Sequence, residues 1–509
     1  MLSKVTTFAL SGLNGVPISV ETDINNGLPA FELVGLAEAA VKESKERVRS
    51  AIKNSCRKFP EHKIIVNLAP ADIKKEGAYL DLAIAVGLLK ASEQLVNAPT
   101  DGIVFWGELA LDGSLRPVNG ILPLLISAKD RGYKTFILPR ANAEEAAYIS
   151  GVEVYAANCL SEVLDHLSAL SPLPCIEQKE YAVVKESGGT DQFDMAYVKG
   201  QAAAKRAVEV AVAGAHNILL IGPPGTGKTM LARCMPTIMP DMSFEEALEV
   251  TKIHSVAGLL NGAGLVTHRP FRSPHHTATT VSICGGGNRT IKPGEISLAH
   301  NGVLFLDEMP EYNRSTLESL RQPLEDGVIT VARAATSVVY PANFMLCASM
   351  NPCPCGNYGS ADKVCTCTPA MIHKYHAKLS GPLLDRIDIQ VEVDSVKYED
   401  LAGDSPEESS AEVKKRVEAA RGIQRERFAD NEFFVNANMG EREMKRFCKL
   451  DSACEDILRM TFVSLKLSAR ARNRIIKVSR TIADLAGSEQ IQPEHILEAV
   501  SYRKYDKFI

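Results

Sequence analysis

The sequence predicts an α/β chain with three parts: an N-terminal α/β domain, a central α/β core and a C-terminal helical domain. Three observations support this prediction. Strand-like apolar runs alternate with helical runs up to residue 168. A buried strand, a glycine-rich loop and a helix start follow one another at residues 217–229. Beyond residue 396, the apolar residues recur with helical periodicity.

The first domain is predicted from its alternating runs. These are Val16–Val20, Ile64–Leu68, Ile103–Trp106 and Thr135–Leu138 as strands, and Ala37–Ala51, Leu80–Leu89 and Ala141–Ser150 as helices. Prolines, paired glycines and mixed charge then indicate a linker. The predicted boundaries are residues 1–168 for this domain, 169–194 for the linker, 195–395 for the core and 396–509 for the helical domain. Ser409 and Glu412 are expected to form a capping box that opens a helix.

The composition limits the classes of protein to consider. The 509 residues carry a formal net charge of −5, with a pI of about 6.2, so contact with nucleic acid needs a local basic patch. No window approaches eighteen uninterrupted apolar residues, and no clear cleavage signal follows the first residues. We therefore expect no membrane partner. Twelve cysteines in such a chain suggest reduced thiols and a cytoplasmic location.

The most specific motif is GPPGTGKT, which matches the phosphate-binding pattern G-x-x-x-x-G-K-[ST] in full. It follows the apolar run Asn217–Ile221 and precedes a helix start, as the motif requires. Lys228 would reach the β- and γ-phosphates of ATP, and Thr229 would hold Mg²⁺. The predicted ATP-binding residues are Gly222, Pro223, Pro224, Gly225, Thr226, Gly227, Lys228 and Thr229.

A second motif, GVLFLDE, is an apolar strand that ends in two carboxylates. Asp307 is predicted to bind Mg²⁺, and Glu308 to polarise the attacking water. A strand with acidic surface ends is the alternative, and the phosphate loop upstream disfavours it.

Two further segments are expected to join the same sheet. Thr330–Val331 with Ser337–Tyr340 is typical of a hairpin, and Phe344–Ser349 is typical of a buried strand. The buried strand leads to Asn351, whose side chain could lie beside the γ-phosphate and orient water.

Taken together, these motifs resemble the YifB/ComM family of magnesium-chelatase-like AAA+ ATPases. The resemblance covers nearly the whole chain and rests on GPPGTGKT, GVLFLDE, CASMNP, SGPLLDRID, Arg269–Gly287, Pro293–Tyr312 and Leu467–Leu485. It implies that Asn351 is the sensor 1 residue, that Arg386 acts in the nucleotide site of a neighbouring subunit, and that Arg470 is the sensor 2 arginine of a helical lid. It also implies an adenine-side element at Tyr197–Gln201. From the residues alone, surface ion pairs would be expected for both arginines.

The resemblance implies an ATP-driven ring motor acting on DNA, a helicase or branch-migration factor that promotes homologous recombination during natural transformation. The expected cofactors are ATP and Mg²⁺. The expected partners are branched DNA or junctions between single strands and duplex, and further copies of the chain in a hexamer. The alternative is a magnesium-chelatase-like motor that remodels a partner protein or inserts a metal into it. A non-catalytic scaffold would need a degraded hydrolysis site, but Asp307 and Glu308 are intact.

The N-terminal stretches Val66–Leu89 and Trp106–Ala128 resemble the Lon-protease-like domain that begins proteins of this family. An active Lon-type site pairs a serine with a lysine. Tyr79 stands at the serine position and Gly120–Leu124 contains no lysine, so protease activity is not expected. A basic run could contact phosphates, although a solvated helix face is the simpler interpretation; it consists of Arg47, Arg49, Lys53, Arg57 and Lys58.

By the same resemblance, parts of the segment His254–Gly287 and the hairpin before Asn351 would project into the pore of a ring. Arg333, near the turn of that hairpin, is placed to contact a phosphate. His275 and His276 suggest a metal site, but adjacent histidines rarely point at one ion and no nearby pair of carboxylates completes a site. Structural or subunit contacts are expected for them instead.

Four cysteines lie close together in a C-x-C…C-x-C pattern: Cys353, Cys355, Cys365 and Cys367. Four thiolates can close a tetrahedral Zn²⁺ site, although C-x-C is tighter than the usual C-x₂-C spacing. The alternatives are a redox-labile disulfide pair, which a reducing compartment disfavours, and plain loop cysteines. In each case the cluster is expected to hold the loop between Asn351 and Arg386.

Overall fold

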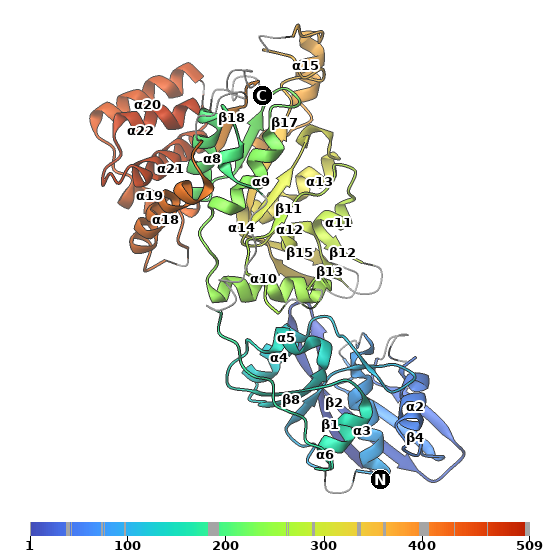
Figure 1. The fold of residues 1–509 in the computed structure, drawn as a ribbon. Coiled ribbons are helices and arrows are strands. Elements are labelled where there is room, and N and C mark those ends of the chain that lie inside the picture. The colour runs from blue at the N-terminus through green and yellow to red at the C-terminus, as the bar shows by residue number, and fades with distance from the viewer. Residues whose placement is uncertain are drawn as a thin grey trace.

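The computed structural model shows three parts that follow one another along an elongated molecule (Figure 1). The N-terminal domain lies at the bottom of the view, the core lies above it, and the C-terminal helices pack against one side of the core. The structure describes residues 2–36, 41, 43–72, 75, 77–95, 98–181, 193–260, 262, 264–287, 291–332, 337–359, 363–395, 407–431, 433–465 and 467–503.

The described strands of the N-terminal domain form a mixed sheet with the order β3-β4-β2-β1-β5-β8-β9. They are β1 (Leu2–Ser11), β2 (Asn14–Asn25), β3 (Ala30–Val34), β4 (Lys63–Ala69), β5 (Ile103–Phe105), β8 (Thr135–Pro139) and β9 (Glu153–Ala157). β1 and β2 pair antiparallel along their whole length, whereas β5, β8 and β9 run parallel. Burial alternates along β4, as expected when the two faces of a strand differ in environment.

Helices cover both faces of this sheet. They are α2 (Ser44–Asn54), α3 (Asp81–Ala91), α4 (Ile121–Asp130), α5 (Ala143–Ala146) and α6 (Leu160–Leu167), with a small hairpin of β6 (Glu108–Leu109) and β7 (Leu115–Arg116). Helices α2, α3 and α6 contribute to one apolar cluster, and α4 and α5 contribute to another. Val5 of β1 belongs to the first cluster and Phe8 to the second, so this strand separates the two.

Two predicted helices differ in extent from those observed. The helix expected at Ala141–Ser150 is limited to the four residues of α5 after a 3-10 turn at Arg140–Asn142. The Asn142 side chain hydrogen-bonds the backbone of Val118 through both its oxygen and its nitrogen, so the helix begins after this residue. The helix expected at Ala37–Ala51 is observed from Ser44 onward. Residues 37–40 and 42 lie outside the described part of the chain.

Buried polar contacts join the N-terminal domain to the core. The Ser255 hydroxyl donates to the Glu145 carboxylate (2.8 Å), and the Gly120 amide donates to the Ser255 carbonyl (3.1 Å). Burial raises the pKa of Glu145, against the lowering effect of its hydrogen bonds. Farther along, the Tyr181 hydroxyl donates to the Met242 carbonyl (2.9 Å), so the chain leaving the first domain stays attached to the core.

The core is built on a parallel sheet with the strand order β11-β14-β17-β10-β18. Its strands are β10 (Ile218–Ile221), β11 (Phe271–Arg272), β14 (Val303–Leu306), β17 (Met345–Met350) and β18 (Ile389–Glu392). Every residue of β10, β14 and β17 is buried, as expected for parallel strands covered on both faces. The three strands predicted from apolar runs are therefore the centre of the sheet.

The helices of the core are α8 (Ala202–Gly214), α9 (Lys228–Ile238), α10 (Phe244–Ala257), α11 (Thr280–Cys284), α12 (Glu295–Leu298), α13 (Arg314–Ser319), α14 (Arg321–Asp326), α15 (Pro369–His376) and α16 (Gly381–Leu384). A short hairpin joins β12 (Gly285–Gly286) and β13 (Lys292–Pro293). The predicted hairpin is present as β15 (Val328–Ala332) and β16 (Ser337–Pro341), with Val331 opposite Val338. Its expected place in the main sheet is wrong, because among the strands that the structure describes β15 and β16 pair only with each other. Several of their residues are exposed, which does not suit a sheet covered on both faces.

The C-terminal domain consists of helices that pack on α8 and α9 of the core. They are α18 (Ser410–Arg427), α19 (Glu441–Phe447), α20 (Ser452–Leu465), α21 (Ala469–Leu485) and α22 (Pro493–Ser501). The predicted capping box is confirmed: Ser409 Oγ accepts from the Glu412 amide, and the Glu412 carboxylate accepts from the Ser409 amide. Val208 of α8, Val417 of α18 and Ile475 of α21 share one apolar cluster, so this domain and the core have a continuous hydrophobic interior.

Asp388 makes polar contacts between the core and the C-terminal domain, which is called the lid from here on. Its carboxylate lies 3.2 Å from His216 Nδ1 and 3.6 Å from Arg474 Nε of α21. Burial alone would raise the pKa of Asp388, but His216, Arg474 and Lys477 together lower it to about 2. The ionised carboxylate therefore stabilises the folded lid.

We expect Asp388→Asn to reduce the free energy of unfolding by about 2 kcal/mol at neutral pH. Since the folded pKa lies below the unfolded one, the contribution is fully present above about pH 4 and is lost as the pH falls towards 2. Urea unfolding near pH 7 and near pH 3 measures it, and about half should remain near pH 3. Asp385→Asn is the control, because Asp385 is half-exposed and lies 3.9 Å from an exposed arginine. Equal destabilisation at both pH values would contradict the assignment.

Candidate nucleotide site

The phosphate loop joins β10 to α9 at the carboxyl edge of the core sheet, where parallel α/β folds bind their ligands. Gly225 and Gly227 adopt φ angles of +83° and +85°, which residues with a Cβ atom rarely accept. The Gly222 amide donates to the Met350 carbonyl at the end of β17 (3.2 Å). The loop is thus tied to the neighbouring strand, and α9 starts at Lys228 with its N-terminus at the loop.

Lys228 lies buried at the edge of this loop. Its Nζ donates to the carbonyl oxygens of Gly222 and Pro223, both at 2.7 Å. Burial lowers the pKa of Lys228, whereas the charges of Asp307 and Glu308 raise it. The ammonium group is therefore held at the loop, where the charges of the two carboxylates predicted to serve hydrolysis act on it.

Asp307 is the centre of an oxygen-rich group. Thr229 Oγ1 of α9 donates to Asp307 Oδ2 (3.1 Å), and the Ser349 hydroxyl of β17 donates to Asp307 Oδ1. A hydroxyl and a carboxylate fit Mg²⁺, which takes one or two protein oxygens and leaves its other positions to water and phosphate. A bound Mg²⁺ would supply charge stabilisation for phosphoryl transfer. Ser349 was missed by the sequence analysis, because its contact depends on how β14 and β17 align.

Glu308 has an unusual backbone for a residue with a side chain. Its φ of +51° lies in the left-handed region, and its amide donates to Ser349 Oγ (3.1 Å). Strained backbone of this kind gathers at functional sites. The side chain is 53% exposed, and one oxygen lies 4.0 Å from His276 Nδ1. Glu308 is therefore open to solvent, as a residue that polarises water must be.

The paired histidines take different partners. His276 lies beside Glu308, whereas His275 Nδ1 lies 2.8 Å from the Thr277 hydroxyl. The neighbourhood of His276 and Glu308 was not expected from sequence, since the two residues are far apart along the chain.

Asn351 follows β17 directly and faces the phosphate loop. Its Oδ1 accepts from Lys228 Nζ at 3.4 Å. On the other side of the loop, the Gln201 side chain donates to the Asp394 carbonyl (2.6 Å) and lies 3.5 Å from the Thr226 carbonyl. The predicted adenine-side element is thus adjacent to the loop.

The two arginines assigned by resemblance lie elsewhere. Arg386 forms an ion pair with Glu325 of α14 and donates to the Pro382 carbonyl. Arg470 is 69% exposed, and its Nη1 lies 3.9 Å from Asp385, the residue before Arg386. The structure therefore brings Lys228, Thr229, Asp307 and Asn351 together. Arg386, whose side chain is only 9% exposed, and the exposed Arg470 contact other residues.

The N-terminal residues singled out from the sequence have structural partners. The Tyr79 hydroxyl accepts from the Leu10 amide (3.1 Å). Arg47, in the basic run, pairs with the buried Asp81 (2.7 Å), and Arg49 lies over the ring of Phe59. These two arginines therefore stabilise the domain rather than line a phosphate-binding face. Arg333 of the pore hairpin lies outside the described residues.

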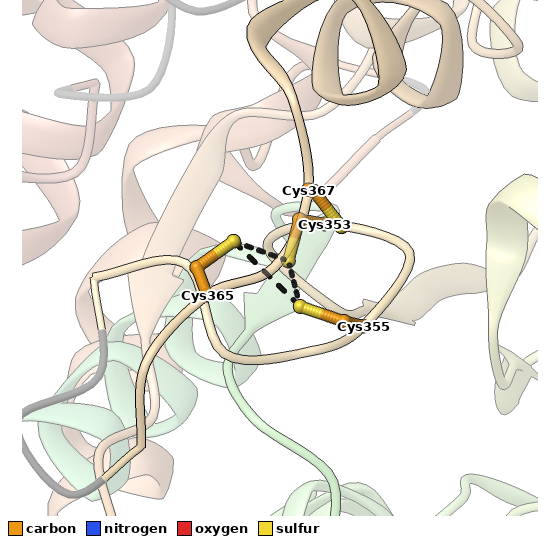
Figure 2. Close-up of side chains that lie close together, drawn as sticks. All are labelled: Cys353, Cys355, Cys365 and Cys367. Carbon is orange, nitrogen blue, oxygen red and sulfur yellow. Dashed lines mark hydrogen bonds between the residues drawn. The ribbon is translucent and has the colours of Figure 1, made fainter.

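The four cysteines converge on one point after β17 (Figure 2). The Sγ–Sγ distances are 3.3 Å between Cys353 and Cys355, 3.7 Å between Cys353 and Cys365, and 3.6 Å between Cys355 and Cys365, and all four sulfurs lie within 4.8 Å of one another. Four thiolates bound to zinc at about 2.3 Å stand roughly 3.8 Å apart. The donor set and its spacing therefore fit a tetrahedral zinc ion.

Neighbouring groups already favour a thiolate in this cluster. The backbone amides of Asn357 and Thr366 donate hydrogen bonds that lower the pKa of Cys355 to about 5. Desolvation and the adjacent thiols raise the pKa of Cys367 to about 12. One thiol of the cluster, Cys355, therefore ionises readily, whereas ionisation of Cys367 is disfavoured unless a cation is bound.

Comparison with known proteins decides the family. The model for "Subunit ChlI of Mg-chelatase" matches residues 20–142, that for "Magnesium chelatase, subunit ChlI" matches residues 194–401, and that for "Magnesium chelatase, subunit ChlI C-terminal" matches residues 407–503. Competence protein ComM of Haemophilus influenzae is 43% identical over 509 residues, which cover 99% of this chain and 97% of that protein. The chain belongs to the YifB/ComM family of magnesium-chelatase-like AAA+ ATPases.

Other relatives of this YifB/ComM protein agree with that placement. Uncharacterized protein YifB of Escherichia coli is 45% identical over 516 residues, covering 100% of this chain and 98% of that protein. Lon protease 2 of Bacillus subtilis is 29% identical over 148 residues, 29% of this chain and 26% of that protein. The predicted fold class is confirmed. Membership in the family also implies an ATPase that uses ATP and Mg²⁺. Of the helices that the structure describes, none is both long and apolar enough to cross a membrane.

Proposed function

We propose that this protein is an ATP-driven ring motor that acts on DNA, as a helicase or branch-migration factor promoting homologous recombination during natural transformation. The observation that carries the proposal is the group of hydrolysis residues around Lys228 and Asp307, within a chain that is 43% identical to a competence protein over nearly its full length. Glu308 polarises the attacking water, and Asn351 orients it. The protein works in the cytoplasm, where DNA is present and thiols stay reduced.

Hydrolysis in this motor depends on assembly. Arg386 and Arg470 contact Glu325 and Asp385 rather than the residues around Lys228, which supports a role for Arg386 in the site of a neighbouring subunit. A cation supplied in trans stabilises the charge that develops on the transferred phosphoryl group. The proposed assembly is a homo-hexamer, in which each nucleotide site is completed by the next copy.

The proposed DNA contact lies in the pore of the ring. The hairpin of β15 and β16 is not hydrogen-bonded to the described strands of the core sheet, although its Ile329 and Tyr340 pack into the same apolar cluster as that sheet. Its contact with DNA is mainly electrostatic and includes Arg333, so binding should weaken steeply as salt rises. The test is binding of forked and three-stranded DNA at low salt, with the salt titration as the second readout. A protein that hydrolyses ATP and ignores both DNAs would contradict the proposal.

The second candidate is a magnesium-chelatase-like motor that remodels a partner protein or drives metal insertion into it. It is favoured by the names of the three family models, which match the chain in order. The two candidates share the ATPase site and differ in what stimulates it. Protease activity is expected in neither, because the sequence has Tyr79 at the position of the serine and no lysine in Gly120–Leu124.

We assign a structural zinc ion to Cys353, Cys355, Cys365 and Cys367. The convergence of four sulfurs at distances suited to tetrahedral coordination supports this assignment. We expect about one zinc per chain in freshly purified protein, measured by elemental analysis. The double variant Cys365→Ser and Cys367→Ser should lose the metal, and Cys56→Ser, which changes an exposed cysteine elsewhere, should retain it. Wild-type protein without stoichiometric zinc would refute the assignment.

A further inference from the structure

The cysteine loop touches the phosphate loop. Gly356 directly follows Cys355, and its φ of +80° lies in the left-handed region. A Cβ atom at Gly356 would lie 2.6 Å from Pro224 Cδ and 3.3 Å from Pro224 Cγ. Atoms without a bond between them do not approach so closely, so only glycine lets the cysteine loop lie against this phosphate-loop proline.

The same loop is fixed to the other parts of the site. Cys353 is fully buried two residues after Asn351, and its sulfur accepts from the Tyr358 amide (3.3 Å). At the far end, α15 begins two residues after Cys367, and its buried His376 has Nε2 2.9 Å from the Pro352 carbonyl. The Asn351 backbone hydrogen-bonds the Tyr375 hydroxyl. The four sulfurs therefore join both halves of this loop, between the phosphate loop and α15.

We propose that the metal held by the four cysteines fixes the contact between Gly356 and Pro224 of the phosphate loop. Zinc binding and nucleotide binding would then strengthen each other. The inference rests on the zinc and ATP sites of the proposed function and adds a coupling between them. The metal fixes the position of its ligand Cys355, and Cys355 in turn fixes the next residue, Gly356, against the phosphate loop. By thermodynamic linkage, the factor by which zinc tightens nucleotide binding equals the factor by which nucleotide tightens zinc binding.

The coupling is measured on the full-length protein from both sides. Binding of a fluorescent ATP analogue to zinc-loaded and to chelator-stripped protein should differ by at least about fivefold in Kd. In the reverse direction, the analogue with Mg²⁺ should slow the transfer of zinc to the dye 4-(2-pyridylazo)resorcinol. Neither readout depends on hydrolysis.

A matched pair of variants tests the contact itself while keeping all four cysteines. Gly356→Ala places a methyl group against Pro224, whereas Gly359→Ala imposes a similar backbone strain (φ +78°) in the same loop with nothing within 4 Å. Both variants should keep their zinc. Gly356→Ala should weaken nucleotide binding by at least about fivefold, and Gly359→Ala should stay within about twofold of wild type.

The possible outcomes distinguish a failure of the coupling from a failure of the zinc site or of the nucleotide site on which it depends. Equal nucleotide affinities for Gly356→Ala and Gly359→Ala, or zinc and nucleotide that bind independently, would overturn the coupling and leave both sites in place. A wild-type protein that holds no zinc would overturn the zinc assignment and the coupling together, while the ATPase would stand. A protein that binds no nucleotide would overturn the motor as well.

Discussion

Lys228→Ala should reduce ATP turnover by at least about a hundredfold while the protein stays folded. The reason is the position of the ammonium group, buried at the edge of the phosphate loop and facing Asp307 and Glu308. Alanine removes the only positive charge that the described structure places inside this group of residues, where the transferred phosphoryl would carry its negative charge. Steady-state release of phosphate at saturating ATP measures the effect.

Lys129→Ala is the matched control for this variant, because Lys129 is exposed on α4 of the N-terminal domain. Its turnover should equal that of wild type, and circular dichroism should show the same helix content in all three proteins. A Lys228→Ala protein that keeps more than about a tenth of wild-type turnover would show that phosphate is bound elsewhere.

Arg386→Ala should lower turnover by roughly a thousandfold, the size of effect typical of an arginine supplied in trans. This variant and Lys228→Ala damage different halves of the same interface. When the two inactive proteins are mixed, some interfaces combine an intact Lys228 from one copy with an intact Arg386 from its neighbour. We therefore expect mixing to restore a fraction of the turnover, which rises with total protein concentration.

Arg321→Ala is the control, since Arg321 lies on α14, the helix of Glu325, and pairs with Glu318 of α13 (2.8 Å). It should neither lose activity nor alter the mixing result. Two inactive variants that stay inactive when mixed, although each assembles, would show that Arg386 acts within its own chain or only in folding.

The parts of the fold that could be predicted are those encoded in short stretches. β10 and β14 are wholly buried apolar runs, and β17 is a buried run with Ser349 as its one polar residue, so each could be recognised from its sequence. β18 was missed because Gln390 and Glu392 interrupt its apolar character, and β11 has only two residues. The hairpin of β15 and β16 was found, but its separation from the main sheet depends on tertiary packing that alternation alone does not specify.

The same division holds at the site. Lys228, Thr229 and Asp307 belong to contiguous motifs whose spacing carries the chemistry. Ser349 and His276 lie inside stretches that carry the family resemblance, CASMNP and Arg269–Gly287, but neither was assigned a role at the site from the sequence. Ser349 reaches Asp307 because β14 and β17 pair with Leu306 opposite Ala348, which sets the next residues of both strands side by side. The register between two strands is a property of the folded sheet, and no short stretch of the sequence specifies it. The approach of Gly356 to Pro224 is of the same kind.

The central claim is that DNA controls this ATPase, and the most direct test is turnover measured with and without forked or three-stranded DNA at low salt. We predict that DNA raises turnover several-fold, that the stimulation disappears as salt rises, and that Lys228→Ala shows none. Zinc-loaded protein and a homogeneous oligomer are the conditions for the assay. ATP hydrolysis that is identical with and without DNA, in protein that also fails to bind either DNA at low salt, would contradict the account.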